Sequence, residues 1–510
     1  MNHSTQNIRT DAVTWLIEVA CAYKMKDRTL DLGVILMDNF LDFKTVEKEK
    51  FQAIAITCLF IANKIIDTFS MSIENIIYLT DNSYNRTTIL NLEHEILDTL
   101  EFDTYHDTLI QNIKTIPRKL TRENRHLALF ISRIVLTTVE YRYLNLNTLA
   151  KKIVDFCLLI NLSNVDYVID YDPIFVHLYN LWLENNTETS IIKKIFTSKK
   201  YFKTRLMEPP LLQVRKKTIL KNNCSKKYRQ ECFIKSYKKN FIDKINLSRI
   251  VGKGTFGVVS KTRINDKLIA IKYITSNNND GFDSYMIREI SSMKLLVHPN
   301  IVKLYGYYYD IDTMAIYLFM DFINKPLKEK INDVNTHYKT KKSLILQLLQ
   351  GIGFMHSCKI MHRDLSINNI LVTNDDVLKI CDFGSSRYFT DVRCNEKYST
   401  FVCTLSFRAL ELLLKIEIYN EMVDVWSCAC LIHYILNGQV LFPGFQEEEV
   451  IKNIYELLGY PHEKEKGLII KNNFEKENKI LKKMLVHEPH ERICINEALE
   501  LFTKCYYENL

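Results

Sequence analysis

The segment H-R-D-L-S-I-N-N, from His362 to Asn369, decides how this 510-residue sequence is interpreted. Within it, Asp364 could orient a substrate hydroxyl and accept its proton, and Asn369 could hold a magnesium ion. Asp382, which begins the triplet D-F-G, is placed to hold a second magnesium ion. The pattern predicts phosphoryl transfer, in which a protein supplies mainly positioning and electrostatic stabilisation.

The residues before this loop fit a site for a phosphorylated nucleotide. Three short β-rich runs between residues 247 and 274 predict strands, and G-K-G-T-F-G-V-V at 252–259 fits G-x-G-x-x-G-x-V. Glycines there let backbone N–H groups close over phosphate oxygens. Lys272 on the third run could hold phosphates if Glu289, on an amphipathic helical stretch, pairs with it. The glycine pattern alone is weak, but all the elements in this order predict a phosphotransferase.

Residues 244–505 resemble the protein kinase superfamily and, within it, the cyclin-dependent kinases. The finer match rests on I-R-E-I at 287–290, L-F-P-G at 441–444 and L-G-Y-P at 458–461. The resemblance implies a bilobal fold with a β-rich small lobe and an α-rich large lobe, and it implies ATP and Mg²⁺ as cofactors. It also implies functional residues, namely Asp364, Lys272 and Glu289 in catalysis, Asn369 and Asp382 as metal ligands, and an ATP site of Val251, Gly252, Lys253, Gly254, Thr255, Phe256, Gly257, Val259, Ala270, Lys272, Met320, Asp321 and Ile323.

Regulation is also implied by the resemblance. Arg288, Arg363 and Arg387 occupy the positions that in this family converge on a phosphorylated residue of the activation segment. That residue aligns with Ser399, and Thr400 stays open as an alternative because the segment is longer than usual. The match therefore implies an upstream activating kinase.

The end of the activation segment bears on the substrate. Thr404 resembles the threonine that serine/threonine kinases place beside the catalytic aspartate. Val402, Cys403 and Arg408 fall where the family builds its pocket for a proline after the phosphoacceptor, so proline-directed protein substrates are a hypothesis. Phe256 replaces the tyrosine that is the family's inhibitory phosphorylation site, and that brake is expected to be missing.

Ser366 departs from the family, because most serine/threonine kinases carry a lysine there. Losing one donor to the transferring phosphoryl group costs about 3 kcal/mol, or on the order of a hundredfold, by analogy with an oxyanion-hole donor. Three alternatives stay open: an active kinase with its own cyclin, a pseudokinase scaffold with low or no turnover, and a cyclin-like subunit that activates a separate kinase in trans. Leu410 and Ala429, which also depart from the family, favour the second a little.

The N-terminal half is predicted to be helical. Apolar residues between Ala12 and Tyr23 recur at the spacing of one helix face, and similar runs continue to Ile160. The first of these runs resemble a cyclin box, on Trp15–Val19, Asp38–Leu41 and Ala62–Lys64, and in cyclins the residues that match Lys64 and Glu93 contact the kinase. The sequence thus resembles a cyclin and its kinase in one polypeptide, with the cyclin-like half as an intramolecular partner.

We therefore expect an α+β chain in which an all-α, cyclin-like double helical bundle precedes the kinase fold. The expected parts are a cyclin-like domain at 1–195, with a first box at about 8–103 and a weaker second repeat at about 105–190, a basic linker at 196–243, and a protein kinase domain at 244–510. The match to cyclin and kinase suggests cell-cycle or transcription control by analogy.

Composition indicates a soluble intracellular protein, in the nucleus, the cytoplasm or both. No run of 18 apolar residues and no basic leader is present, and the 13 cysteines show no zinc or disulfide spacing. The net charge is +8, and residues 191–240 hold 16 Lys or Arg against only Glu208 and Glu231. We interpret this basic run as a solvated linker rather than as a nucleic-acid site.

Overall fold

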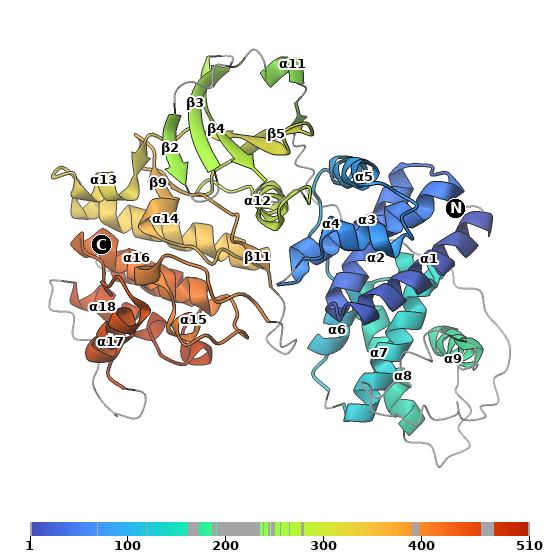
Figure 1. The fold of residues 1–510 in the computed structure, drawn as a ribbon. Coiled ribbons are helices and arrows are strands. Elements are labelled where there is room, and N and C mark those ends of the chain that lie inside the picture. The colour runs from blue at the N-terminus through green and yellow to red at the C-terminus, as the bar shows by residue number, and fades with distance from the viewer. Residues whose placement is uncertain are drawn as a thin grey trace. The chain divides into compact units, whose positions relative to one another are not determined.

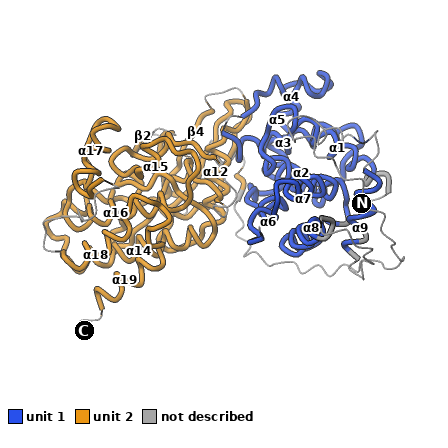
Figure 2. The backbone as a smooth tube through the Cα atoms, turned by 90° about the horizontal axis from the view of Figure 1, so that it is seen from below, with its two compact units in different colours: residues 1–231 blue, residues 232–510 orange. Residues whose placement is uncertain are grey.

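The computed structural model divides the chain into two compact units, an N-terminal unit of residues 1–231 and a C-terminal unit of residues 232–510 (Figure 2). The residues that the structure describes are 3–68, 70–118, 120–161, 173–185, 190, 235–237, 239–242, 245, 250–254, 257–264, 266–276, 280–389, 397–460 and 474–507. No helix within these ranges is both long enough and apolar enough to cross a membrane.

The N-terminal unit is built from helices, and α3 lies at the centre of its first bundle (Figure 1). Its elements are α1 (His3–Ala22), α2 (Asp27–Phe43), the 3₁₀ turn η1 (Lys48–Lys50), α3 (Phe51–Ile66), α4 (Ile73–Leu79), α5 (Arg86–Thr99), α6 (Leu109–Thr115), α7 (Arg122–Thr137), the 3₁₀ turn η2 (Val139–Tyr143), α8 (Leu146–Asn161) and α9 (Pro173–Asn185). Side chains on all sides of α3 are buried, because its sequence is apolar all round. Helices α1, α2 and α5 pack against it.

A second group of helices follows, in which α6, α7, α8 and α9 pack against one another. Trp182 on α9 is fully buried, and its ring meets that of Phe156 on α8 edge to face at 6.1 Å. Thr108 and Gln111 form a capping box that fixes the start of α6, and Thr121 caps α7. Part of the predicted second repeat, residues 162–172 and 186–189, lies outside the described residues.

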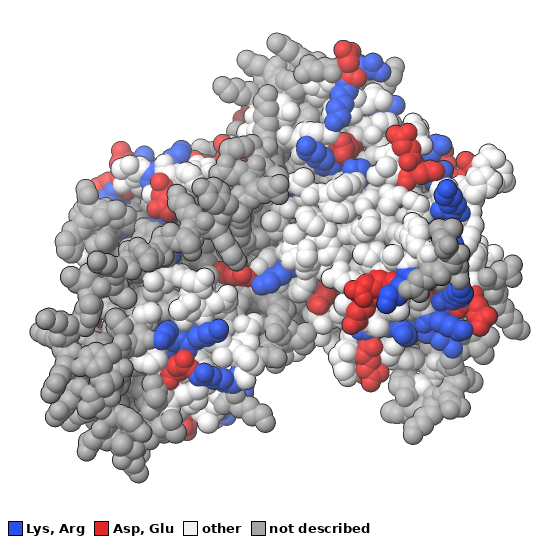
Figure 3. All heavy atoms as spheres, turned by 180° about the vertical axis from the view of Figure 1, so that it is seen from behind, with Lys and Arg blue, Asp and Glu red and all other residues white. Residues whose placement is uncertain are grey.

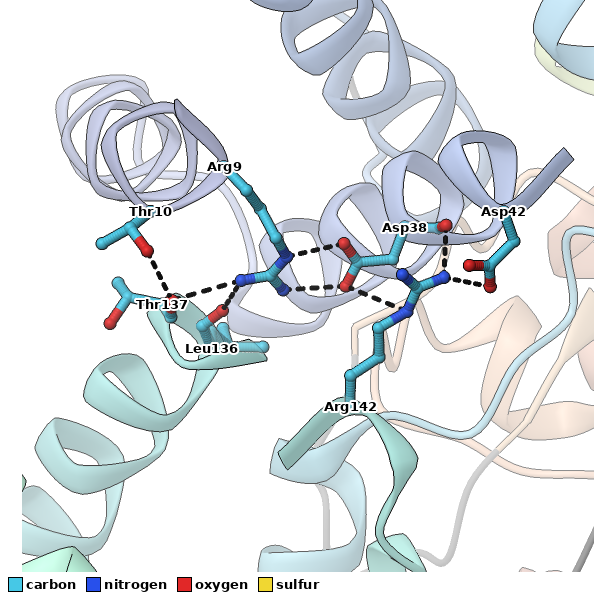
Figure 4. Close-up of polar contacts among 7 residues, drawn as sticks. All are labelled: Arg9, Thr10, Asp38, Asp42, Leu136, Thr137 and Arg142. Atoms are coloured by element: carbon cyan, nitrogen blue, oxygen red, sulfur yellow. Dashed lines mark hydrogen bonds and ion pairs between the residues drawn. The ribbon is translucent and has the colours of Figure 1, made fainter. Parts of the chain in front are cut away.

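A buried ion-pair cluster joins the two bundles (Figure 4). Arg9 on α1 donates from Nε and Nη2 to the carboxylate of Asp38 on α2, at 2.7 and 2.8 Å. Its Nη1 donates to the main-chain oxygens of Leu136 and Thr137 at the end of α7, at 3.1 and 3.2 Å. Nε of Arg142 in η2 lies 3.8 Å from the same Asp38 carboxylate. Because loss of one partner leaves a buried charge uncompensated, this cluster fixes how the bundles meet.

A second arginine makes the same kind of link. Arg133 on α7 donates to Asp27 and Asp31 of α2, at 2.6 and 2.7 Å. Asp31 also accepts the N–H of Ile110 at 3.0 Å. Burial raises the pKa of Asp31, although Arg133 acts in the opposite direction. The two bundles are therefore held together by side chains that lie about a hundred residues apart in the sequence.

The C-terminal unit begins with a lobe built on a sheet of six strands, in the order β1-β5-β6-β4-β3-β2. Its elements are β1 (Lys235–Ser236), α11 (Lys239–Ile242), β2 (Ile250–Gly254), β3 (Gly257–Ile264), β4 (Lys267–Thr275), α12 (Ser284–Leu295), β5 (Leu304–Asp310) and β6 (Ala315–Asp321). Neighbouring strands are antiparallel, except that β1 runs parallel to β5. Helix α12 packs against β5 (Figure 1).

The second lobe of this unit is mainly helical. Its elements are β7 (Lys325–Pro326), α13 (Leu327–Asn332), α14 (Tyr338–Ser357), β8 (Ile360–Met361), η4 (Ile367–Asn369), β9 (Ile370–Val372), β10 (Leu378–Ile380), β11 (Arg387–Tyr388), η6 (Leu405–Phe407), α15 (Leu410–Leu413), α16 (Met422–Asn437), α17 (Glu447–Leu458), α18 (Glu475–Met484), η7 (Pro489–Glu491) and α19 (Ile495–Tyr507). Helix α16 is buried on all sides between α14 and α18. The buried pair Arg492–Glu411, bidentate at 2.8 and 2.7 Å, fastens η7 to α15.

The predicted fold class is confirmed, because helical bundles precede a lobe built on a sheet and a helical lobe. Within the predicted linker, the described residues 235–237 and 239–242 form β1 and α11. The Tyr237 ring lies 4.6 Å from the Phe319 ring, and Ile242 packs against the same apolar cluster. The remainder of the predicted linker lies outside the described residues.

Charges of both signs are mixed on the molecular face shown in Figure 3. The described Lys and Arg side chains there lie among Asp and Glu side chains rather than in a patch of one sign. A nucleic-acid site is typically marked by a basic stripe. The described part of this face lacks such a stripe.

Candidate active site

A buried lysine links strand β4 to helix α12. Lys272 pairs in register with Leu318 of β6, which fixes its place in the sheet. Its Nζ lies 2.6 Å from Oε1 of Glu289 on α12 and 3.0 Å from Oδ1 of Asp382. The ion pair predicted between Lys272 and Glu289 is therefore present, and one ammonium group serves two carboxylates.

The charges of this triad depend on one another. Burial disfavours the ammonium ion of Lys272, but Glu289 and Asp382 outweigh that effect and raise its pKa. Burial raises the pKa of Glu289 to about 7, against the lowering effect of Lys272. Its second oxygen, Oε2, is buried without a hydrogen-bond partner among the described residues. Burial also opposes the charge of Asp382, yet Lys272 keeps the pKa of Asp382 below its ordinary value.

The loop after β8 holds Asp364 between an amide and a threonine. Nδ2 of Asn369 donates to Oδ2 of Asp364 at 3.0 Å and to its main-chain oxygen at 2.8 Å. The other carboxylate oxygen accepts the N–H of Thr404 at 3.0 Å, and the Thr404 hydroxyl lies at 3.4 Å. Burial raises the pKa of Asp364. These contacts fix the carboxylate at a point where a substrate hydroxyl could meet it.

Hydrogen bonds to Asp424 of α16 hold the main chain of this loop. The buried carboxylate of Asp424 accepts the N–H groups of His362 and Arg363, at 2.7 and 2.8 Å. Arg363 adopts a φ of 66° and Asp382 one of 65°. Such left-handed backbone is unfavourable for residues with a Cβ and persists where surrounding contacts enforce it. Both residues therefore have backbone that the fold, rather than local preference, dictates.

Strands β2 and β3 carry the predicted glycine-rich segment. Gly252 pairs with Val259 across the two strands, and Gly254 pairs with Gly257. At Gly257, φ is +148° and an added Cβ would meet the Tyr273 oxygen at 2.3 Å, so only glycine fits. Among the predicted nucleotide-binding residues, Thr255, Phe256 and the side chain of Lys253 lie outside the described part of the structure.

The remaining predicted nucleotide-binding residues lie on β2, on β4 and at the end of β6. Val251 is half exposed, while Ala270 and Met320 are buried and paired in register. The carboxylate of Asp321 accepts hydrogen bonds from the Tyr305 hydroxyl and from the N–H of Lys303. Ile323, which follows β6, is half-buried.

The donor set fits a magnesium-bound nucleotide. Asp382 offers a carboxylate, and Asn369, whose Nδ2 serves Asp364, retains its oxygen. Oxygen ligands of this kind are those that Mg²⁺ prefers, and it is commonly bound by one or two carboxylates plus phosphates. The ammonium group of Lys272 adds a cation for phosphate oxygens.

The predicted arginines behave differently from one another. Nε of Arg288 donates to the main-chain oxygen of Gly384 at 3.4 Å, and Nε of Arg363 donates to that of Ser385 at 2.8 Å. Arg387 lies on β11 and pairs with Met361 of β8. Ser399 is half-buried, whereas Thr400 is buried. Arg288 and Arg363 thus bind the main chain at the last residue of D-F-G and at the residue after it.

Cys403, within the predicted proline pocket, has an unusual backbone. Its φ is 69°, and its main-chain oxygen accepts Nε and Nη2 of Arg408, at 3.3 and 2.9 Å. Nη1 of Arg408 donates to Glu447 at 2.6 Å. The carbonyl of Cys403 therefore accepts two hydrogen bonds from an arginine that the Glu447 carboxylate holds in place.

Ser366 lies in a fully buried position. Its hydroxyl has no hydrogen-bond partner among the described residues. A buried hydroxyl cannot reach a phosphoryl group without moving, so Ser366 does not replace the lysine of the family in this arrangement.

Sequence reasoning missed two hydroxyl contacts that hold this region together. The hydroxyl groups of Ser292 on α12 and Ser386 after D-F-G lie 2.6 Å apart, and both residues are fully buried. The hydroxyl of Tyr419 lies between Arg363 and Ser399. Neither contact belongs to a recognisable motif, since serine and tyrosine occur throughout the chain and the partners are distant in sequence.

Lys64 and Glu93, predicted to contact the kinase, form an ion pair with each other. Nζ of Lys64 on α3 lies 2.6 Å from Oε1 of Glu93 on α5, and both side chains are buried. The same Nζ lies 4.0 Å above the ring of Phe60. Their predicted contact with the C-terminal unit stays a prediction.

Comparison with known proteins matches both halves of the chain. The family model of the protein kinase domain matches residues 245–502, and that of the cyclin N-terminal domain matches residues 1–105. "Putative serine/threonine-protein kinase L673" of Acanthamoeba polyphaga mimivirus is 33% identical over 488 residues, which cover 90% of this chain and 87% of that protein. L670 and L268 of the same virus carry the same description, are each 30% identical, and align with 98% of this chain and with 94% and 97% of their own lengths.

Proposed function

Because the chain belongs to the serine/threonine protein kinases and carries a cyclin N-terminal domain, we propose that it is an ATP- and Mg²⁺-dependent enzyme of cyclin-dependent type, activated in cis by its own cyclin-like half. The observation that carries the proposal is the triad of Lys272, Glu289 and Asp382. It forms only when helix α12 stands close to β4, and α12 bears the I-R-E-I sequence that resembles the cyclin-contacting helix.

Each residue then has a role in phosphoryl transfer. Asp364, oriented by Asn369 and Thr404, accepts the proton of the substrate hydroxyl. Lys272 holds the α- and β-phosphates, and Glu289 keeps Lys272 in place. Asn369 and Asp382 would hold magnesium, which when bound neutralises charge on the phosphates. A raised pKa suits Asp364 to its task, because a carboxylate with a higher pKa is a better proton acceptor.

The enzyme proposal is tested with purified full-length protein, radiolabelled ATP and a general acceptor protein. Asp364→Asn should lose roughly 10²–10⁴-fold in turnover, the usual contribution of a positioned acid or base. Wild-type incorporation no higher than that of Asp364→Asn would favour the second candidate, a pseudokinase scaffold. The buried Ser366, which cannot supply the lost donor, is the observation that favours that candidate.

Activation in cis follows from the covalent connection of the two halves. A random-coil connector of about 40 residues would span roughly 35 Å and give an effective concentration on the order of millimolar. Such a concentration favours docking even through a modest interface. The relatives L670 and L268 align with 98% of this chain, so the two halves also occur together in them.

A protease site introduced between residues 210 and 225 tests the cis proposal. Before cleavage, specific activity should be independent of protein concentration, because the partner is tethered. After cleavage it should fall on dilution to nanomolar concentration and recover when the protein is concentrated. Cleaved protein that keeps full activity at nanomolar concentration would contradict activation in cis. The control is the same protease treatment of protein that lacks the introduced site.

We further propose proline-directed substrates. The carbonyl of Cys403 is taken by Arg408, so it cannot accept the N–H of the substrate residue after the phosphoacceptor. A proline there has no N–H and loses nothing, whereas another residue leaves a donor without a partner, which costs about 1–3 kcal/mol when buried. Peptides that differ only by proline or alanine at that position should differ about tenfold or more in kcat/KM. Equal values would contradict the proposal.

The proposal also covers how the enzyme is regulated and where in the cell it acts. We assign Ser399 as the site that an upstream kinase phosphorylates, with Arg288, Arg363 and Arg387 as its surroundings. Intact-mass spectra of protein from its natural host would reveal whether Ser399 carries phosphate. An intracellular role in cell-cycle or transcription control rests on the analogy with cyclins and their kinases alone.

A further inference from the structure

Residues 397–399, the segment around Ser399, lie beside the main chain that connects α15 to α16. Lys397 and Ile418 form an antiparallel bridge, and the N–H of Tyr398 donates to the oxygen of Glu417 at 2.8 Å. The rings of Tyr398 and Tyr419 lie 5.4 Å apart. Residues 397–399 are therefore held by backbone pairing and ring packing, together with an ion pair of 2.7 Å between Lys397 and Glu417.

The hydroxyl of Tyr419 adds a polar link that runs to the catalytic loop. It lies 2.9 Å from Nη1 of Arg363 and 2.5 Å from the main-chain oxygen of Ser399. A guanidinium group can only donate, so the hydroxyl accepts from Arg363 and gives its own proton to Ser399. Both Tyr419 and Arg363 are buried, at 8% and 4% exposure, so water competes little for this link.

Arg363 connects this link to the catalytic centre. Its N–H binds Asp424, its Nε binds the oxygen of Ser385, and the residue after it is Asp364. Three parts of the site thus meet at one guanidinium group: the catalytic loop, the start of the activation segment and, through Tyr419, its far end at Ser399.

We propose that Tyr419 is a positioning residue that holds the Ser399 end of the activation segment against the catalytic loop before any phosphate is added. This inference rests on the proposed function and deepens its regulation. Phosphorylation of Ser399 then adds to an order that already exists instead of creating it. The unphosphorylated enzyme retains substantial activity, and the Tyr419 hydroxyl matters most in that form.

The test compares Tyr419→Phe with wild type, in full-length protein, both without phosphate and with phosphoserine incorporated genetically at position 399. Without phosphate, Tyr419→Phe should lower kcat/KM for a peptide substrate about tenfold, the effect of one hydrogen bond to a charged group. With phosphoserine at 399, the loss should shrink to about twofold or less, because the phosphate supplies Arg363 with a stronger partner. A purely structural role would give equal losses in both forms, and that result overturns the proposal.

Tyr434→Phe is the matched control, because it removes the hydroxyl of another buried tyrosine in the same lobe. It should leave both forms unchanged. If Tyr419→Phe fails to fold, hydrogen exchange of the unphosphorylated wild type decides: the Tyr398 amide should be protected, and rapid exchange there overturns the proposal. A wild type no more active than Asp364→Asn would instead sink the proposed function, so the two failures are distinguishable.

Discussion

Two buried lysine–glutamate pairs, one in each unit, have the same geometry and different surroundings. Lys64–Glu93 and Lys272–Glu289 both have an N–O distance of 2.6 Å, and all four side chains are almost wholly buried. Lys64 lies over an aromatic ring, whereas Lys272 has a second carboxylate, Asp382, at 3.0 Å. The distance and burial of an ion pair therefore do not reveal its role, and the third group beside it does.

That third group changes the electrostatics. One lysine between two carboxylates leaves a surplus negative charge, and burial raises the pKa of Glu289 to about 7. A magnesium ion and phosphates would complete such a site, which fits a catalytic centre. The pair of Lys64 with Glu93 joins α3 to α5, which fits a link that stabilises the fold.

The largest effect is expected at Lys64. Lys64→Met should lower the free energy of unfolding of the N-terminal unit by about 3–5 kcal/mol, because it removes the cation that lies 2.6 Å from the buried Glu93 carboxylate. Adding Glu93→Gln to the same protein should recover part of the loss. Lys44→Met is the control: the pair of Lys44 with Glu95 is half exposed, and its removal should cost less than about 1 kcal/mol. Urea denaturation measures all three, and equal losses at both sites would break the contrast.

At Lys272 the loss should appear in catalysis rather than stability. Lys272→Met should lower kcat by roughly 10²–10³-fold, as expected for a lost donor in a pre-organised site. The thermal unfolding temperature should change little, because Glu289 can take up a proton once the ammonium group is gone. Lys267→Met, an exposed lysine on the same strand, should leave kcat unchanged. A stability loss like that of Lys64→Met would erase the distinction between the pairs.

The two lysine–glutamate pairs differ in how far the sequence could predict them. Glu289 was predicted as the partner of Lys272 because both belong to elements whose type and order the periodicity indicates, and the structure contains that pair. Lys64 and Glu93 were each assigned by resemblance to a partner surface. Their mutual pairing depends on how α3 meets α5, which follows from side-chain packing and not from spacing along the chain.

Other features of the structure were not predicted from the sequence, for related reasons. Residues 235–237 and 239–242 were assigned to a basic linker, since a two-residue strand and a helix of one turn are too short to show a period, yet β1 pairs with β5 and Tyr237 packs on Phe319. Tyr419 was missed because its role comes from two hydrogen bonds to residues 56 and 20 positions away. Contacts of this kind are set by tertiary structure, which local patterns do not encode.

If the triad around Lys272 is complete, turnover should be limited elsewhere in the site, at Ser366. Ser366→Lys should raise kcat about tenfold, less than the roughly 10²–10³-fold of a well-placed donor, because the new side chain must leave a buried position. Ser366→Ala is the control and should change little, since the Ser366 hydroxyl has no partner among the described residues to lose. A Ser366→Lys enzyme no faster than wild type would place the limit outside the catalytic loop.

The smallest expected effect is a dependence of activity on pH that comes from the protonation of Glu289. Only its carboxylate form holds Lys272, and burial raises the pKa of Glu289 to about 7. Activity should therefore rise by a few-fold between about pH 6 and pH 8. In Glu289→Gln this rise should be absent, because the variant has no proton to lose there, and a rise of the same size in the variant would assign the titration to another group.

Stability should move in the opposite direction. The pKa of Glu289 in the folded protein lies above its ordinary value of 4.5, so the folded state binds this proton more tightly than the unfolded state does. The resulting stability is fully present below about pH 4.5 and is lost as pH rises through about 7. Thermal unfolding of wild type against Glu289→Gln between pH 5 and pH 8 isolates this contribution. A pair that served only to stabilise the fold would show activity and stability changing together, so opposite slopes identify the catalytic one.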